Sequence, residues 1–291
     1  MKTLTNLALT AVALLGARAA VAQPAGLMKQ DAASAGKTDV AAEGFQAAER
    51  DKEDAKDATE AKISAGGMLT TGNARSLAAT TAGNFRLRRS LNQLSIAAAA
   101  NYSRAAANAD ADMETTVENY QGKVRYDRFV AKQLALFLST SARRDRFQGL
   151  DLRLNLDPGV AYYFIDEKAQ QLWTEIGYDL QYDVRRDENI DAAAAKGESV
   201  DKTKVQHSGR LFAGYTNSVN EHVKFNTGVE YLQGLPETER WRLNWDVGLS
   251  SAIGGDFSLA TTFSLKYDHA PLPGVKELDT VTAINLVYTL M

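Results

Sequence analysis

Cysteine is absent from the 291-residue sequence, and histidine occurs only three times. Without cysteine the chain can form no disulfide, no thiolate metal site and no lipid anchor of the bacterial lipoprotein kind. The catalytic options that depend on histidine reduce to His207, His222 and His269. The chemistry of the protein must therefore come from other side chains or from its fold.

Long apolar runs are also absent after the first residues. Lys2 precedes an apolar stretch from Leu4 to Leu15, which is too short to span a bilayer as a helix. The following Ala20-Val21-Ala22 has the small residues that signal peptidase accepts, so residues 1–22 are predicted to be a secretory signal peptide cleaved after Ala22. An N-terminal membrane anchor is the alternative, and the length of the run speaks against it.

No later segment approaches the roughly 18 apolar residues of a transmembrane helix, and the mean hydropathy is -0.30. A low mean does not exclude a membrane β-barrel, because only alternate side chains of its strands meet lipid. The formal charge of -3 comes with no basic, aromatic-rich patch, so nucleic acid is not an expected partner.

Residues 23–60 have a different composition from the rest of the chain. The segment is rich in Ala, Gly, Ser and Lys, and charges of both signs crowd together from Ala47 to Lys62. It has too little apolar area to offset the entropy of ordering, so we expect a polar periplasmic lead-in that is partly helical or disordered. A helix that plugs the barrel is the alternative, although no apolar stripe is available to dock it.

From residue 61 onward apolar and polar residues alternate. Along 171–184 the apolar side chains Ile176, Tyr178 and Leu180 alternate with Asp179 and Gln181, a period that a helix cannot produce. The predicted strands are 62–71, 75–88, 92–104, 115–127, 133–145, 151–165, 171–184, 203–217, 223–234, 240–252, 257–269 and 277–290. Their lengths suit a tilted strand that crosses a bilayer, so residues 61–291 are predicted to form an antiparallel up-and-down transmembrane β-barrel of about twelve strands.

The connections between these strands are alternately short and long, as in bacterial outer-membrane barrels with tight periplasmic turns and larger external loops. Residues 185–202 form the longest predicted external loop. An even number of strands places both ends of the barrel in the periplasm. Aromatic residues of the apolar face then fall into two girdles, one near each membrane interface.

The polar face of the strands is predicted to line the lumen. It carries basic and acidic residues in nearly equal numbers, whereas a strongly selective pore would have rings of one sign. The candidate lumen network is Lys123, Arg125, Asp145, Asp151, Arg153, Asp179, Asp183, Arg210, Arg242 and Asp246. We expect Arg153 to have acids on both sides. A narrow, weakly selective passive channel and a lumen closed by ion pairs both agree with this lining.

The stretch from Thr70 to Asp183 resembles a family of uncharacterised proteobacterial outer-membrane proteins known as salt-induced outer-membrane proteins. The matching pieces are Thr71-Gly72-Asn73, Arg125-Tyr126-Asp127-Arg128-Phe129, and Asp145-Arg146-Phe147-Gln148-Gly149-Leu150-Asp151-Leu152-Arg153. Ala161 departs from the family's usual Gly-x-Gly-Tyr pattern. The resemblance implies an outer-membrane location, and it brings no established activity and no functional residues.

Neither an enzyme nor a metal site is expected. His207 is predicted on the apolar face with no serine nucleophile at the same depth on the neighbouring strands. The loop acids lack the ligand spacing and turn glycine of a calcium loop. No catalytic residue, metal or cofactor is predicted. The expected partners are outer-membrane lipid and lipopolysaccharide, with the barrel-assembly machinery during biogenesis, and we expect a monomer with either a conducting or a structural, envelope-stress role.

Overall fold

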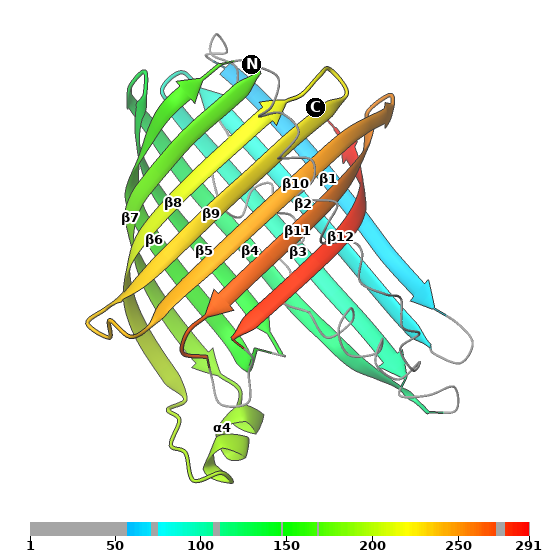
Figure 1. The fold of residues 1–291 in the computed structure, drawn as a ribbon, viewed down its shortest axis with the longest axis vertical. Coiled ribbons are helices and arrows are strands. Elements are labelled where there is room, and N and C mark those ends of the chain that lie inside the picture. The colour runs from blue at the N-terminus through cyan, green and yellow to red at the C-terminus, as the bar shows by residue number, and fades with distance from the viewer. Residues whose placement is uncertain are drawn as a thin grey trace, which may run out of the picture.

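In a computed structural model, twelve antiparallel strands form one closed β-barrel (Figure 1). The structure describes residues 57–70, 75–106, 111–146, 148–167, 169–271 and 277–290. The strands are β1 (Asp57–Thr70), β2 (Ser76–Arg89), β3 (Asn92–Ala106), β4 (Met113–Ala131), β5 (Leu134–Asp145), β6 (Leu150–Asp166), β7 (Gln170–Arg185), β8 (Thr203–Ser218), β9 (Val223–Leu235), β10 (Trp241–Gly254), β11 (Phe257–Asp268) and β12 (Leu278–Thr289). Each strand pairs with its neighbours in the sequence, and β12 closes on β1.

The predicted fold class is confirmed, and all twelve predicted strands are present. The largest difference is at the start, because β1 begins at Asp57, five residues before the predicted Lys62. Residues 57–60 therefore belong to the barrel and not to the lead-in. The predicted signal peptide and residues 23–56 lie outside the described residues. Among the described residues, no helix is long and apolar enough to cross a membrane.

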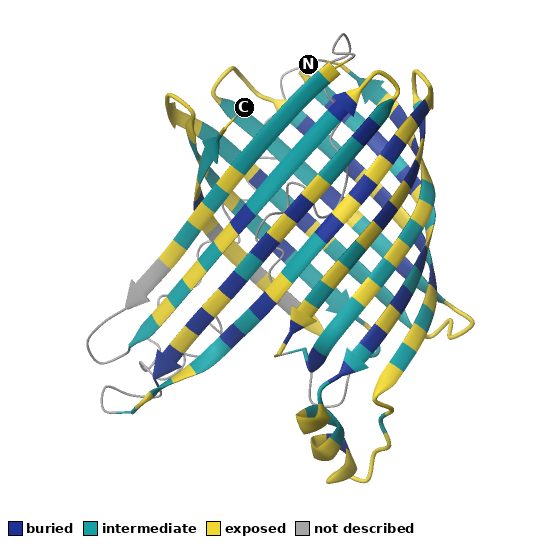
Figure 2. Ribbon diagram, turned by 180° about the vertical axis from the view of Figure 1, so that it is seen from behind, coloured by how far each residue is buried: buried dark blue, intermediate teal, exposed yellow. Residues whose placement is uncertain are grey.

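The two faces of the sheet differ in burial along most of the described strands, which gives the banding of Figure 2. On β7, Ile176 is 66 % exposed on the outer face, while the adjacent Glu175 is 1 % exposed in the lumen. Because successive side chains of a strand point to opposite faces, this phase applies to the whole strand. On this strand Ile176, Tyr178 and Leu180 therefore face outward, and Glu175, Asp179 and Asp183 face inward, as the alternation predicts.

The two ends of the barrel differ in their connections. One end, called the turn end here, has the short links between β2 and β3, β4 and β5, β6 and β7, β8 and β9, and β10 and β11. The opposite, loop end has the longer link from β7 to β8, which contains the helix α4 (Asp187–Ala194). Asp187 and Glu188 in the first turn of α4 suit the positive end of the helix dipole.

Ion pairs attach this loop to the barrel rim. Arg186 lies 3.3 Å from Asp151, and Lys202 lies 2.7 Å from Asp187 and 3.5 Å from Asp151. The hydrogen bond with Asp187 raises the pKa of Lys202 above its usual value. Asp151, Asp187 and Lys202 are exposed, so each pair stabilises the loop only weakly.

The closing seam between β1 and β12 is shorter than the other strand pairings. It runs from Lys62, opposite Thr289, to Ala65, opposite Leu286. By contrast, β1 is paired with β2 over its full length. Toward the loop end, the remaining parts of β1 and β12 separate, as Figure 1 shows at the end of β1. The described backbone of the barrel is therefore least tightly closed at this point.

Candidate functional site

The lumen has two unlike halves. From β4 to β8 the inward side chains are large, charged or aromatic, and most of them are buried. Along β10, β11, β1 and β2 many inward side chains are small and only half-buried. These are Ser64, Gly66, Ala78, Thr80, Ser250, Ser258, Ala260 and Thr262. Along β10, β11, β1 and β2 the described inward side chains thus leave part of the lumen accessible.

Arg125 of β4 is the centre of a buried ion-pair chain in the filled half. Its guanidinium donates to Asp127 on the same strand and lies 2.9 Å from a carboxylate oxygen of Glu175 on β7. Glu175 also accepts from Arg210 of β8 at 2.7 Å, and Arg210 in turn reaches Glu230 of β9 at 2.6 Å. The contact from β4 to β7 crosses over β5 and β6, so it is a bridge through the lumen and not along the wall.

Aromatic rings support this chain. The guanidinium carbon of Arg125 lies 4.0 Å from the ring centroid of Phe137, and that of Arg210 lies 5.5 Å from the centroid of Phe212. Such cation–π contacts are strongest where water is excluded, as it is here. The two arginines are therefore fixed by carboxylates and by ring faces together.

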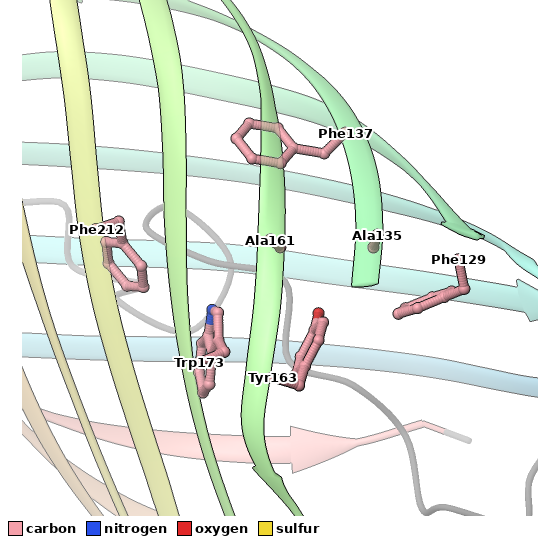
Figure 3. Close-up of a cluster of buried hydrophobic side chains, with 7 residues drawn as sticks. All are labelled: Phe129, Ala135, Phe137, Ala161, Tyr163, Trp173 and Phe212. Carbon is pink, nitrogen blue, oxygen red and sulfur yellow. The ribbon is translucent and has the colours of Figure 1, made fainter. Parts of the chain in front are cut away.

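Towards the turn end, the filled half contains a cluster of inward aromatic residues with two fully buried alanines (Figure 3). The cluster consists of Phe129, Ala135, Phe137, Ala161, Tyr163, Trp173 and Phe212. Tyr163 and Trp173 stack with ring centroids 6.2 Å apart. Ala161, the departure from the family pattern, is one of the residues under these rings, where it is fully buried.

Glycines of adjacent strands make room for the large inward side chains. A β-carbon at Gly214 would overlap the indole of Trp173, and one at Gly228 would lie 2.8 Å from the ring of Phe212. Register explains the first contact, because Trp173 and Gly214 are direct partners across β7 and β8. The glycines are therefore part of the packing of the filled half.

Sequence reasoning missed the aromatic cluster. The signal was present, since Trp173 shares the phase of Glu175, and Tyr163 lies on the face opposite Tyr162 and Phe164. The predicted girdles include only the aromatic residues of the apolar face, so the aromatic residues on the polar phase have no place in that prediction. The aromatic residues of the lumen close the filled half at the turn end.

Nearer the loop end, Arg153 forms a two-pronged ion pair with Asp183 of β7, with both N–O distances at 2.8 Å. Asp179 accepts from Asn155 at 2.6 Å and lies 3.4 Å from Arg242 of β10. The second contact again spans two intervening strands. These inward residues link β6, β7 and β10 just below the loop-end mouth.

The remaining candidates of the predicted network occupy separate positions. Asp145 pairs with Arg143 at 2.7 Å, and Asp151 pairs with Arg186 and Lys202 of the β7–β8 loop. Among the described residues, the carboxylate in ion-pair contact with Arg153 is that of Asp183 on β7. Lys123 and Asp246 are buried inward residues of β4 and β10. The candidate lumen residues thus form several local networks and not one ring.

The described residues contain no group of three or more His, Asp or Glu side chains able to hold a metal ion. His207 lies on the outer face, where its Nδ1 is hydrogen-bonded to the hydroxyl of Tyr178. His269 stacks on Trp241 at the loop end, with centroids 5.4 Å apart. His207 is thus held by a hydrogen bond, and His269 is held by ring stacking.

The family model described as protein of unknown function, DUF481, matches residues 63–290. Among solved structures, an outer-membrane channel from Pseudomonas putida F1 is 11 % identical, with a TM-score of 0.41 and coverage of 83 % of this chain and 99 % of that one. The translocator domain of the autotransporter NalP from Neisseria meningitidis is 11 % identical, with a TM-score of 0.40 and coverage of 79 % and 86 %.

The transport unit of the autotransporter AIDA-I from Escherichia coli is 10 % identical, with a TM-score of 0.37 and coverage of 90 % and 99 %. At these identities the similarity concerns the barrel fold alone. No curated protein matches the chain. None of the matches named here carries the salt-induced description that the sequence resemblance brings.

Proposed function

The chain belongs to the family of proteins of unknown function DUF481, and we propose that it forms a narrow, weakly selective channel for small solutes across the bacterial outer membrane. The observation that carries the proposal is the two-sided lumen. Buried side chains fill the half from β4 to β8, while small, half-buried side chains leave space along β10, β11, β1 and β2. This asymmetric filling leaves a narrow path.

The outer face supports a membrane location. Large apolar side chains such as Ile176, Leu211 and Ile284 are at least half exposed, and in water such a surface would aggregate. Aromatic residues are found on this face at both ends: Phe164 and Phe257 near the turn end, and Tyr102, Tyr182 and Trp241 near the loop end. Two aromatic girdles around an apolar band are typical of outer-membrane barrels.

Weak selectivity follows from the mixed charge of the accessible half. Arg86 of β2 lies 2.7 Å from Glu60 of β1, and Lys62 lies 3.9 Å from the same carboxylate. Opposite charges at the same depth largely cancel in their effect on a passing ion. These side chains do not form a ring of charges of one sign, which strong ion selectivity requires.

Single-channel recording in planar bilayers tests the proposal. We expect a small conductance from the wild-type protein, and we expect Thr262→Trp to reduce it because residue 262 faces the accessible half. Phe263→Trp is the matched control, since the neighbouring residue points outward on the same strand. A wild-type protein that is folded and silent, or a Thr262→Trp variant with unchanged conductance, contradicts the channel proposal.

The second candidate is a non-conducting, structural or envelope-stress barrel with a closed lumen. The buried chain from Arg125 through Glu175 to Arg210, together with the aromatic cluster, favours it, because these groups close half of the lumen without any solute. The name of the resembling family, salt-induced outer-membrane proteins, agrees better with this envelope-stress role than with a channel. Bilayers in which folded protein never conducts would support it.

The proposed partners follow from the membrane location. We propose contact with lipid and lipopolysaccharide through the outer face, and assembly as a monomer by the barrel-assembly machinery. Leu286 and Leu290 are exposed, and the alternation of Leu286, Tyr288 and Leu290 along the last strand supports this assembly proposal, although it is shifted by one residue from the usual pattern. Charge substitution of Leu290 should lower the yield of folded barrel in cells, while in vitro refolding stays unchanged.

A further inference from the structure

A recess at the loop end of the barrel is lined by four arginines. Arg153 comes from β6, Arg185 from the end of β7, Arg240 from the β9–β10 loop and Arg242 from β10. The recess is partly open to solvent at the loop end. These four residues are called the arginine recess below.

Three carboxylates also line the arginine recess, and each already has a partner. Asp183 is held by Arg153, and Glu237 lies 3.0 Å from Lys204 and also pairs with Arg240. The hydrogen bond from Lys204 lowers the pKa of Glu237, so this carboxyl group is ionised at neutral pH. Asp268 accepts a hydrogen bond from the backbone N–H of Ala270 at 3.0 Å.

Arg185 is different, because no described carboxylate is in ion-pair contact with it, although those of Asp183 and Asp201 act on it from farther away. It is 8 % exposed, and its guanidinium donates to the backbone carbonyl of Asp201 at 3.0 Å. Among the described residues no carboxylate lies within 4.0 Å of it, and its Nε has no hydrogen-bond partner. A buried guanidinium that has no ion-pair contact, has other arginines nearby and keeps an unused donor is unfavourable, and an anion placed in the recess would relieve these costs.

We infer that the arginine recess binds the carboxylate of a small amphipathic solute. A planar carboxylate matches the donor fork of a guanidinium, and it can accept from Arg185 while Arg240 and Arg242 add positive potential. Leu232, Leu235 and Pro236 give the recess an apolar flank against which a ring or short chain can pack. Binding does not require that the lumen conducts, but a role as the entry site for permeating solutes rests on the proposed function.

Isothermal titration calorimetry with detergent-solubilised, folded full-length protein tests the inference, with benzoate as the probe. We expect Arg185→Gln to weaken benzoate binding roughly tenfold or more, because a charge-assisted hydrogen bond is lost. Arg186→Gln is the matched control. This neighbour pairs with Asp151 and Glu188 outside the recess, so its removal should leave benzoate affinity unchanged.

A stability measurement gives a second readout that does not depend on conduction. Without ligand, Arg185→Gln should unfold at the same or a higher temperature than wild type, because a buried charge without an ion-pair contact and close to Arg153 and Arg240 is removed. Benzoate should raise the unfolding temperature of wild type and of Arg186→Gln, but not of Arg185→Gln.

Three results would overturn the inference. These are no benzoate binding to the folded wild-type protein, equal affinity in the Arg185→Gln and Arg186→Gln variants, and binding of inorganic phosphate with no binding of benzoate. The last result would assign the recess to phosphate groups, free or on lipopolysaccharide, and would refute the amphipathic carboxylate.

Discussion

The ring of Phe137 on β5 occupies the space that a β-carbon at Gly159 on β6 would fill. The two residues are direct partners across the strands, and a β-carbon at 159 would overlap the ring and lie 2.7 Å from the backbone oxygen of Ile176. Arg125 stacks on the same ring at 4.0 Å. The ion-pair chain of the lumen thus depends on the absence of one side chain two strands away.

Gly159→Ala is therefore expected to destabilise the barrel by about 1–3 kcal/mol, since neither the ring nor the backbone can move freely. Equilibrium unfolding in lipid vesicles measures the effect. Gly209→Ala is the control, because a β-carbon there has no atom within 4 Å. Equal stability of the two variants would show that Phe137 repacks without cost.

Glu175→Gln should cost about 3–5 kcal/mol, because it leaves two buried guanidiniums, Arg125 and Arg210, without their shared counter-charge. The comparison is Glu118→Gln, which breaks a partly exposed pair with Arg146 at 3.8 Å and should cost at most about 1 kcal/mol. Both are measured by the same unfolding assay. Similar losses in the two variants would argue against a buried bridge.

The lipid-facing assignment is tested by arginine substitutions on opposite faces. Ile176→Arg should cost about 2–4 kcal/mol in a bilayer, because residue 176 faces lipid near the middle of β7. Thr262→Arg should cost much less, since the half-buried lumen side of β11 has water and space. A soluble barrel would tolerate Ile176→Arg, so an unchanged stability of this variant would contradict the membrane location.

Arg153→Ala should shift the ion preference of the channel toward cations, because it leaves Asp183 at the loop-end mouth without its partner. The reversal potential across a salt gradient in planar bilayers measures the shift. Arg144→Ala removes an exposed charge that points outward and should leave the reversal potential unchanged. An equal shift of the reversal potential in both variants would contradict a role of the loop-end mouth in ion preference.

The partial seam can be tested with cysteine pairs, because the chain has no cysteine of its own. Ile63→Cys with Tyr288→Cys should form a disulfide, since these residues are paired across β1 and β12. Leu69→Cys with Thr282→Cys, which would be opposite each other if the pairing continued, should remain reduced. Formation of the second disulfide at the same rate would mean that the seam is fully paired in the membrane.

The sequence by itself determined the strands and their faces. Alternation is a local property, so 171–184 and 240–252 could be recognised as strands, and their apolar faces assigned, without knowledge of any neighbour. The order of the strands followed equally simply, because short links force adjacent strands to be antiparallel. Charge balance in the lumen was also readable, since the phase of each strand decides which charges point inward.

Only the tertiary structure decided which inward side chains meet. Arg125 and Glu175 are 50 residues apart and lie on strands separated by two others, so their contact depends on strand stagger and barrel curvature. The predicted grouping of Asp145 and Asp151 with Arg153 was local, whereas these acids are paired with Arg143 and Arg186. The aromatic cluster, the arginine recess and the partial seam have the same origin. Each depends on distances between strands, and a period of two along a strand contains no information on those distances.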